Sequence, residues 1–315
     1  MNVKNVGLRK WFNKKTITKI KASRQLYMMF FLPLVWFAIF CYGPMYGLLI
    51  VFKDYRISQG ILGSQWVGFK HFIRFFNDFY FFRIMRNTLL ISVYGIIVGL
   101  ITAIILAFIL HYCDLKPFKK FAQTITYAPH FISTVVMVGM ILQVLHPRLG
   151  IINIIIQSLG GKPISFVSIP SLFPHVFVWS GVWQHVGWSS IIYLAALIGV
   201  DPTLHEAAIV DGATKLKRAF YVDFPCIKPT ILIIMILDIG GILSVGFEKI
   251  YLMQNDLNLD FSEVISTYVY KVGIYSSIPD YSYAAAIDVF NSFIGIILVV
   301  IANYAAKKMT ETSLW

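Results

Sequence analysis

Six long stretches of the chain are dominated by apolar side chains and contain almost no charged residue. They are 25–52, 87–113, 121–147, 163–200, 229–247 (interrupted by Asp238) and 281–306 (interrupted by Asp288). A helix needs about 20 apolar residues to cross a hydrocarbon core of about 30 Å, so each stretch can hold one span. The fourth stretch opens with several Pro and Ser residues that indicate a loop, and its second part predicts a single helix. The pattern therefore predicts an all-α polytopic membrane protein with six transmembrane helices.

Composition supports this prediction and excludes two other classes of protein. Hydrophobic residues make up 58% and charged residues 13% of the 315-residue chain, against about 45–50% and about 25% in soluble domains. Intrinsic disorder requires low hydrophobicity, which this chain lacks. Its three cysteines, Cys41, Cys113 and Cys226, form neither an even set nor a CxxC pair, so a disulfide-stapled secreted module is excluded as well.

The distribution of positive charge predicts the side of the membrane on which each loop lies. Six spans place both termini on one side. If that side is the cytoplasm, cytoplasmic segments carry 17 of the 27 Lys and Arg residues in 71 positions, and outer segments carry 10 in 96. Basic residues concentrate in cytoplasmic loops, so both termini are expected inside. The outer segment 53–86 is the exception with six bases, and the apolar residues between them indicate an amphipathic segment at the outer interface.

Three regions follow from this topology. Residues 1–25 are expected to form a basic cytoplasmic N-terminus, residues 26–306 the transmembrane domain, and residues 307–315 a cytoplasmic C-terminus. The basic head, with Lys14, Lys15, Lys19, Lys21 and Arg24, is expected to set topology and to contact anionic lipid. No small-x-small cleavage site follows the first apolar run, so we expect a retained span rather than a signal peptide.

Polar and small residues recur at helical spacing inside two spans, and a third span contains one aspartate; these groups must face the protein interior because lipid cannot satisfy them. They are Ser180, Trp183, Gln184, Gly187 and Trp188 in the fourth span, Asp288, Asn291, Ser292 and Gly295 in the sixth, and Asp238 in the fifth. Aromatic rings beside hydrogen-bonding groups suit a sugar. Trp183, Gln184 and Trp188 are therefore candidate residues of a translocation path, with Asp238, Asp288 and Asn291 as further candidates.

Two packing interpretations stand beside this one. The aspartates can instead hydrogen-bond between helices or reach water near a helix end, and tryptophan is common at membrane interfaces. In the second span, the small residues Gly95, Gly99, Ala103 and Ala107 recur every fourth position, which predicts close helix–helix contact rather than a functional face.

The sequence contains no recognisable catalytic constellation. The Gly161–Lys162 pair lacks the leading glycine of a Walker A motif, because Ile156 stands at that position. His205 and Glu206 begin an HExxH pattern without its second histidine, and no GxSxG is present. His146, His175 and His185 have no Cys or acidic partner at metal-ligand spacing. We therefore expect no enzyme activity and no metal site.

The segment 201–230 combines several structural devices in thirty residues, and it reads DPTLHEAAIVDGATKLKRAFYVDFPCIKPT. Asp201 is a candidate N-cap followed by Pro202 at the first helical position. Gly212 permits a sharp turn with positive φ. A basic second helix is expected after it, ended by Pro225 and Pro229, from which the fifth span begins. The pattern predicts helix, turn, helix and proline stop.

This segment resembles the EAA loop of permease subunits of binding-protein-dependent ABC importers. The match covers Glu206, Ala207, Ala208, Asp211, Gly212, Ala213, Phe220, Pro225 and Pro229 in residue and spacing. Further stretches are similar to the complex-polysaccharide (LplB-like) branch of the carbohydrate permeases: 43–55, 68–76, 86–92, 127–133, 187–202, 246–253 and 313–315. Two positions depart from the family pattern: His205 stands where Tyr is common, and Asp223 stands where an apolar residue is usual.

The resemblance implies a type I ABC importer permease fold with cytoplasmic coupling helices at 202–221. It implies a second homologous permease, two ATPase subunits that bind ATP and Mg, an extracytoplasmic sugar-binding lipoprotein, and an oligosaccharide or polysaccharide fragment as cargo. The chain itself is expected to bind no cofactor and no nucleic acid, and to lie in the bacterial cytoplasmic membrane. The alternative is a proton-coupled secondary transporter that uses Asp238 and Asp288 as relays.

Overall fold

The structure, a computed structural model, describes residue 18 and residues 22–310. Most of the basic head and the C-terminal tripeptide 313–315 therefore lie outside the described residues. The chain divides into two units, Met1–Gly68 and Phe69–Trp315. This division falls within the range 26–306 that the sequence suggested as one domain, and each unit is described separately.

The first unit is built on one helical run from Arg24 to Phe52, which is long and apolar enough to cross a membrane. Its segments are α3 (Arg24–Phe37), η1 (Ala38–Tyr42), α4 (Gly43–Met45) and η2 (Tyr46–Phe52). A small antiparallel hairpin of β1 (Lys53–Asp54) and β2 (Gln65–Trp66) follows, with α5 (Gly60–Gly63) between its strands. The predicted first span is confirmed within the described residues.

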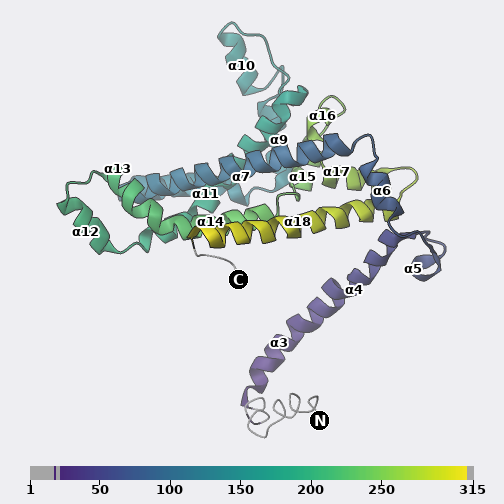
Figure 1. Cartoon of the computed structure of the whole chain (residues 1–315). Coiled ribbons are helices and arrows are strands. Elements are labelled where there is room, and N and C mark those ends of the chain that lie inside the picture. The colour runs from purple at the N-terminus through teal and green to yellow at the C-terminus, as the bar shows by residue number, and fades with distance from the viewer. Residues whose placement is uncertain (1–17, 19–21, 311–315) are drawn as a thin grey trace. The chain divides into compact units, whose positions relative to one another are not determined.

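Four long helices form the frame of the second unit (Figure 1): α7 (Phe81–Tyr112), α11 (Phe173–Ile198), α14 (Phe224–Gly240) and α18 (Tyr281–Thr310). The core between α7 and α11 is built around Ala103, Ala107 and Leu110 on one helix and Tyr193 and Leu197 on the other. Small side chains let two helices approach closely, which is the role that the sequence predicted for Ala103 and Ala107.

The third predicted span is bent. It consists of α8 (Lys116–Tyr127), η3 (Ala128–Phe131) and α9 (Thr134–Val144), with an angle of 105° at the break. Pro129 and the extended Ile132–Ser133 pair interrupt the helical hydrogen bonds, and Ser133 restarts the helix by accepting a hydrogen bond from the Val136 amide. The described residues contain four continuous helical runs long and apolar enough to span a membrane, or up to six spans if each bent pair counts as one.

The fifth span begins earlier than expected. The sequence predicted that Pro225 and Pro229 would end the preceding helix, but the chain stays helical from Lys215 to Gly240 through α13 (Lys215–Arg218), the π-turn η5 (Ala219–Asp223) and α14. Pro225 lies in the first turn of α14 and Pro229 lies inside it, so each proline lacks an N–H within the continuous helical run. A π-turn before the prolines absorbs the local misfit, so the prolines do not break the helix.

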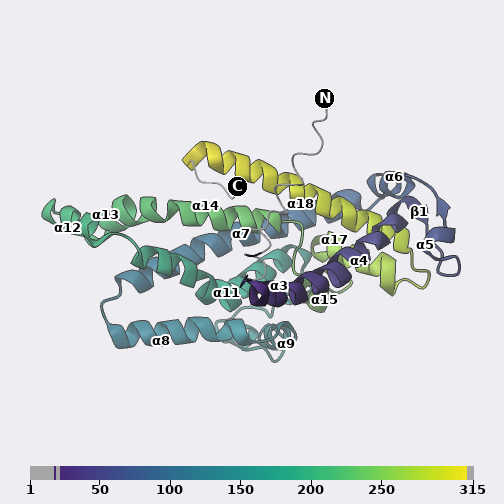
Figure 2. The ribbon, with the colours of Figure 1, turned by 90° about the horizontal axis from the view of Figure 1, so that it is seen from below.

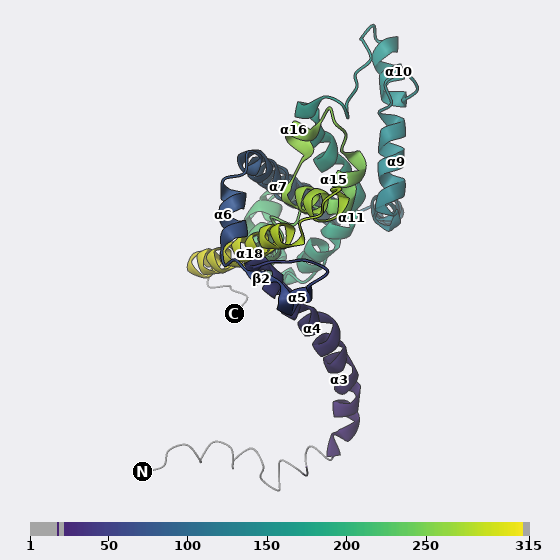
Figure 3. The same cartoon turned by 90° about the vertical axis from the view of Figure 1, so that its right-hand side faces the viewer.

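Short elements occupy the two ends of this frame. At one end lie α12 (Pro202–Val210) and α13, and at the other end lie α6 (Lys70–Phe76), α15 (Phe247–Met253), α16 (Leu259–Ser262), α17 (Ile265–Tyr270) and η6 (Lys271–Tyr275), as Figures 1 and 2 show. The segment α9, together with α10 (Ile151–Ser158), projects from the frame, which Figure 3 shows from the α6 end. The short η4 (Pro170–Leu172) leads into α11.

The α6 end explains part of the positive charge in the segment 53–86. Arg74 pairs with Asp280 at 2.7 Å, and Arg83 pairs with Asp260 and with Glu263. Arg86 donates to the Asp260 carbonyl at 2.7 Å. Three of the six bases are thus matched by acids or carbonyls from 260–280, which places the two predicted outer loops at the same end of the molecule.

Candidate functional site

The segment 201–230 folds locally much as its sequence indicates. The Asp201 carboxylate accepts a hydrogen bond from the Thr203 amide at 2.9 Å and caps α12. This hydrogen bond to the backbone lowers the pKa of Asp201, because the charged form of the carboxylate is the better acceptor. Gly212 has φ +75°, a conformation that a side chain would strain. Thr214 caps the next helix by accepting a hydrogen bond from the Lys217 amide. The predicted helix–turn–helix is confirmed.

This end of the molecule presents apolar side chains to its surroundings. Val210 is 88% exposed, and Leu204, Leu216, Phe220 and Tyr221 are also exposed. Of the residues matched to the EAA loop, Glu206, Ala207 and Asp211 are exposed and Ala208 and Ala213 are half-buried. Short helices that carry exposed apolar residues around small alanines form a surface that another protein can approach closely.

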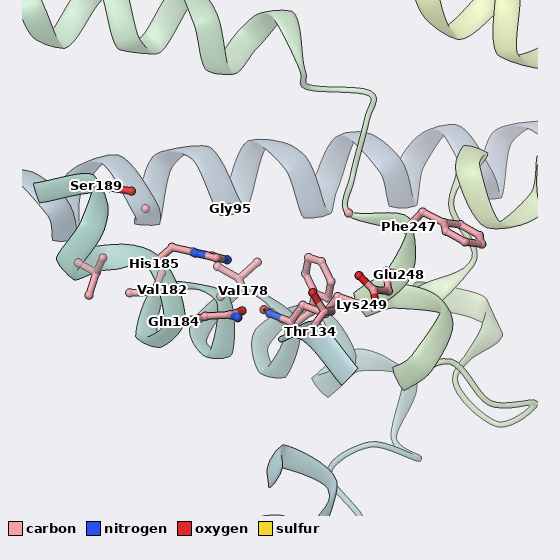
Figure 4. Close-up of a pocket in the computed structure, with 15 residues that line it drawn as sticks. Gly95, Thr134, Val178, Val182, Gln184, His185, Ser189, Phe247, Glu248 and Lys249 are labelled. Carbon is pink, nitrogen blue, oxygen red and sulfur yellow. Dashed lines mark hydrogen bonds between the residues drawn. The ribbon is translucent and has the colours of Figure 1, made fainter. Parts of the chain in front are cut away.

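A cavity of about 450 Å³ lies between α7, α11 and α15 (Figure 4). Its polar lining comes from Thr134, Gln184, His185, Ser189, Glu248 and Lys249, and Gly95 and Gly99 form its α7 wall. Gly95 and Gly99 therefore border open space, Ala103 lies between the core and a neighbouring cavity, and Ala107 packs in the core. The sequence had assigned the whole stripe to packing.

Glu248 and Lys249 are the charged groups of this cavity, and Lys249, which sequence reasoning missed, is the buried one. Its side chain is 9% exposed, and its ammonium donates to the Phe177 carbonyl at 2.7 Å and lies 4.5 Å from the centre of the Phe177 ring. Burial lowers the pKa of Lys249 to about 7. Lys249 lies in the segment 248–283, which hydropathy assigned to an outer loop. The only sequence feature that drew attention to it was the similarity of 246–253 to the carbohydrate permeases.

The predicted path residues do not share one cavity. Gln184 lines the first cavity and donates to the Ile132 carbonyl at 2.9 Å, at the break between α8 and α9. Trp188 and Asp238 line a neighbouring cavity of about 420 Å³, which shares Gly95, Gly99 and Ser189 with the first. Three of the six candidates thus surround one contiguous region beside α7.

The other three candidates lie elsewhere. Trp183 faces an apolar cavity of about 560 Å³ between α9 and α11. Asn291 lines a cavity of about 420 Å³ between α14 and α18, together with Ser292 and Gly295. Asp288 is exposed and lines none of these four cavities. Successive polar positions on one helix face therefore point into different spaces.

Packing contributes to the polar face of α11 as well. At Gly187 an added Cβ would lie 2.0 Å from the Thr126 carbonyl oxygen, so α8 crosses α11 at this glycine. Trp188 stacks on His130 with ring centres 4.5 Å apart, and His130 Nδ1 lies 3.1 Å from His185 Nδ1. The face thus combines a close helix crossing with a cavity wall, and each interpretation drawn from the sequence describes part of it.

Comparison with known proteins identifies the family. Residues 95–311 match the family described as "Binding-protein-dependent transport system inner membrane component". The chain is 39% identical over 302 residues, 96% of this chain and 94% of the relative, to the polygalacturonan/rhamnogalacturonan transport system permease protein YteP of Bacillus subtilis. It is 40% identical over 296 residues, 94% and 92% of the two chains, to protein LplB of the same organism.

Solved structures agree with this assignment. A chain of a bacterial ABC transporter involved in the import of the acidic polysaccharide alginate superposes with a TM-score of 0.87 at 34% identity, over 94% of this chain and 100% of that chain. A second structure of the alginate transporter, in complex with an alginate pentasaccharide-bound periplasmic protein, gives a TM-score of 0.87 at 35% identity. The expected type I importer fold is confirmed, and the secondary-transporter alternative has no support. The chain belongs to the inner membrane components of binding-protein-dependent transport systems.

Proposed function

We propose that the chain is a permease subunit of an ATP-driven importer of an oligosaccharide or polysaccharide fragment delivered by an extracytoplasmic solute-binding protein. The observation that carries this proposal is similarity over more than 90% of both chains to a polygalacturonan/rhamnogalacturonan permease, together with the structural match to an alginate importer. The protein would act in the bacterial cytoplasmic membrane with both termini inside.

The complex would contain a second homologous permease and two ATPase subunits. ATP and Mg would bind to the ATPase subunits, because this chain has no Walker A motif. The exposed apolar side chains of α12 and α13 suit docking in a cleft of an ATPase. Glu206, Ala207, Ala208, Asp211, Gly212, Ala213, Phe220 and Pro225 would form this coupling surface, with Gly212 setting the angle between its two helices.

The cargo path would follow the contiguous space beside α7. Gln184, Trp188 and Asp238 border this space and offer a ring and hydrogen-bonding groups, which suit the apolar face and the hydroxyls of a sugar. Trp183, Asn291 and Asp288 stay candidates for contacts made elsewhere along the route, including surfaces shared with the second permease.

Lys249 suggests that the cargo is acidic. A buried ammonium is costly unless an anion or acceptor compensates it, and the Phe177 carbonyl occupies one of its three donor positions. A uronate carboxylate in the cavity would accept from a remaining donor and favour the charged form of Lys249. A neutral sugar would offer only hydroxyls.

The experiment compares uptake of acidic and neutral oligosaccharides of equal length. The importer is reconstituted in liposomes with saturating solute-binding protein, whose affinity for each sugar is measured separately. Lys249→Met should lower uptake of the acidic sugar several-fold and leave a neutral sugar nearly unchanged. Lys162→Met, which removes an exposed cation between α10 and η4, is the matched control.

Two results would contradict different parts of the proposal. If wild type transports no oligosaccharide although its binding protein is loaded, the import function is wrong. If Lys249→Met lowers uptake of both sugars equally, the lysine acts through the Phe177 carbonyl as a packing group, and the acidic cargo loses its support.

A further inference from the structure

Three side chains from three separate elements meet near the α12–α13 end of the second unit. His111 lies in the last turn of α7, His205 lies on α12, and Asp223 ends the π-turn η5. Each can present one ligand atom, and these atoms lie within 4.8 Å of one another. Asp223 and His205, the two departures from the family pattern, therefore lie in contact with each other.

Asp223 is the centre of this cluster. Its side chain is 0% exposed, and the Tyr112 hydroxyl donates to Oδ2 at 2.5 Å. The other oxygen, Oδ1, lies 3.0 Å from His205 Nε2. Even so, Oδ1 has no hydrogen-bond partner among the described residues, and neither has His205 Nδ1. The imidazole is thus at ion-pair distance from the carboxylate, but its N–H is not directed at the oxygen.

This arrangement matches neighbouring ligands of a metal ion better than a donor and its acceptor. Zn–N and Zn–O bonds of about 2.0–2.2 Å in a tetrahedron place adjacent ligand atoms about 3.3 Å apart. The observed 3.0 Å between His205 Nε2 and Asp223 Oδ1 is close to that edge. The ligand atom of the half-buried His111 lies within 4.8 Å of the other two, so His111 would close in by a side-chain movement to become the third ligand. A water would complete the coordination, as in other sites with three protein ligands.

The surroundings provide the support that such sites require. The Tyr112 hydroxyl holds the carboxylate oxygen that would not bind the metal, which orients Oδ1. Two cations lie near the cluster: the Arg218 guanidinium lies over the Tyr112 ring at 5.9 Å, and Lys119 acts on His111 electrostatically. Lys215 is paired with Asp114 instead. Two imidazoles and a carboxylate form a donor set that suits Zn²⁺ and its neighbours in the first transition row, not Mg²⁺ or Ca²⁺.

We propose that His111, His205 and Asp223 bind one Zn²⁺-class ion. The ion joins the coupling helix α12 to the end of α7 and to the start of α14, because each ligand comes from a different one of these segments. A bridge of this kind restrains movement of α12 against the long helices. The site is independent of the cargo cavity, and its occupancy can be measured without transport.

The test uses the full-length chain in detergent, purified through an affinity tag that contains no histidine. Bound metal is first removed with a chelator. Co²⁺ is added first, because its ligand-field bands report the coordination of the metal, and Zn²⁺ stoichiometry is then measured by equilibrium dialysis. We expect one ion per chain with tetrahedral Co²⁺ bands. His111→Gln, His205→Gln and Asp223→Asn should each weaken binding at least tenfold, and Tyr112→Phe should weaken it about tenfold as a supporting group.

The matched control is His185→Gln, because His130 and His185 form the other close histidine pair among the described residues. It should leave the stoichiometry unchanged. Asp223→Asn retains an acceptor for Tyr112, and size-exclusion profiles identify any variant that misfolds. The proposal is overturned if wild type binds no ion, if binding survives all three ligand variants, or if His185→Gln alone abolishes it.

Discussion

Gly187→Ala is the substitution whose cost follows most directly from the structure. The added Cβ would lie 2.0 Å from the Thr126 carbonyl oxygen and 2.9 Å from the Tyr127 ring. An ordinary contact begins at about 3.4 Å, so α8 and α11 must separate by about an ångström or more at their crossing. The obstructing atom belongs to the backbone and cannot move aside as a flexible side chain could.

The expected loss of stability is large for the addition of one methyl group. Overpacking of a tight core costs about 1–3 kcal/mol, and a clash with backbone belongs at the upper end of that range. Glycine to alanine inside a helix otherwise gains about 0.5–1 kcal/mol. Gly139→Ala supplies this baseline, because Gly139 lies within α9 and nothing lies within 4 Å of its added Cβ.

The assay compares unfolding of wild type, Gly139→Ala and Gly187→Ala in the same detergent by thermal and denaturant titration. The free energy of unfolding of Gly187→Ala should be lower than that of Gly139→Ala by about 2–4 kcal/mol. Equal stability of the two variants would refute the close crossing of α8 and α11. The polar face of the fourth span would then be free of this packing constraint.

Four further predictions test other parts of the molecule. Arg83→Ala should cost more stability than Arg74→Ala, whose exposed pair is worth about 0–1 kcal/mol. It should cost less than the about 3–5 kcal/mol of an uncompensated buried charge, because Lys271 still pairs with the 2% exposed Glu263 at 3.2 Å; equal losses in the two variants would contradict the buried pairing. Gly212→Val should uncouple ATP hydrolysis from uptake, because a β-branched residue resists φ +75°, and normal uptake by a well-expressed variant would exclude this role. Burial lowers the pKa of Lys249 to about 7, so its charge is present below that pH and lost above it. The preference for acidic over neutral cargo should therefore decline as the outer pH rises from about 6 to about 8. In Lys249→Met this preference should not change with pH. In a cysteine-free background, an impermeant thiol reagent applied to intact cells should label Leu257→Cys but not Thr214→Cys, both of which are exposed positions, and the reverse pattern would invert the topology.

Local sequence was sufficient for the features that depend on neighbouring residues. Apolar length alone predicted spans at 25–52, 87–113 and 281–306, and long helices overlap all three, although α7 begins six residues earlier, at Phe81. A spanning helix satisfies its own backbone and needs only an apolar surface. Asp201 and Gly212 were assigned correctly because a cap and a positive-φ turn are formed within a few residues. The residue match to the EAA loop had the same local character.

Tertiary structure decided what depends on contacts distant in the sequence. The bend after α8 is held by Gln184 from α11, and the prolines of α14 are tolerated after a π-turn, neither of which hydropathy can register. Lys249 looked like an ordinary loop cation until α15 placed it against Phe177. His205 and Asp223 are separated from His111 by 94 and 112 positions, so no spacing rule could join them. Their proximity exists only because the helices of the second unit bring three chain segments to one place.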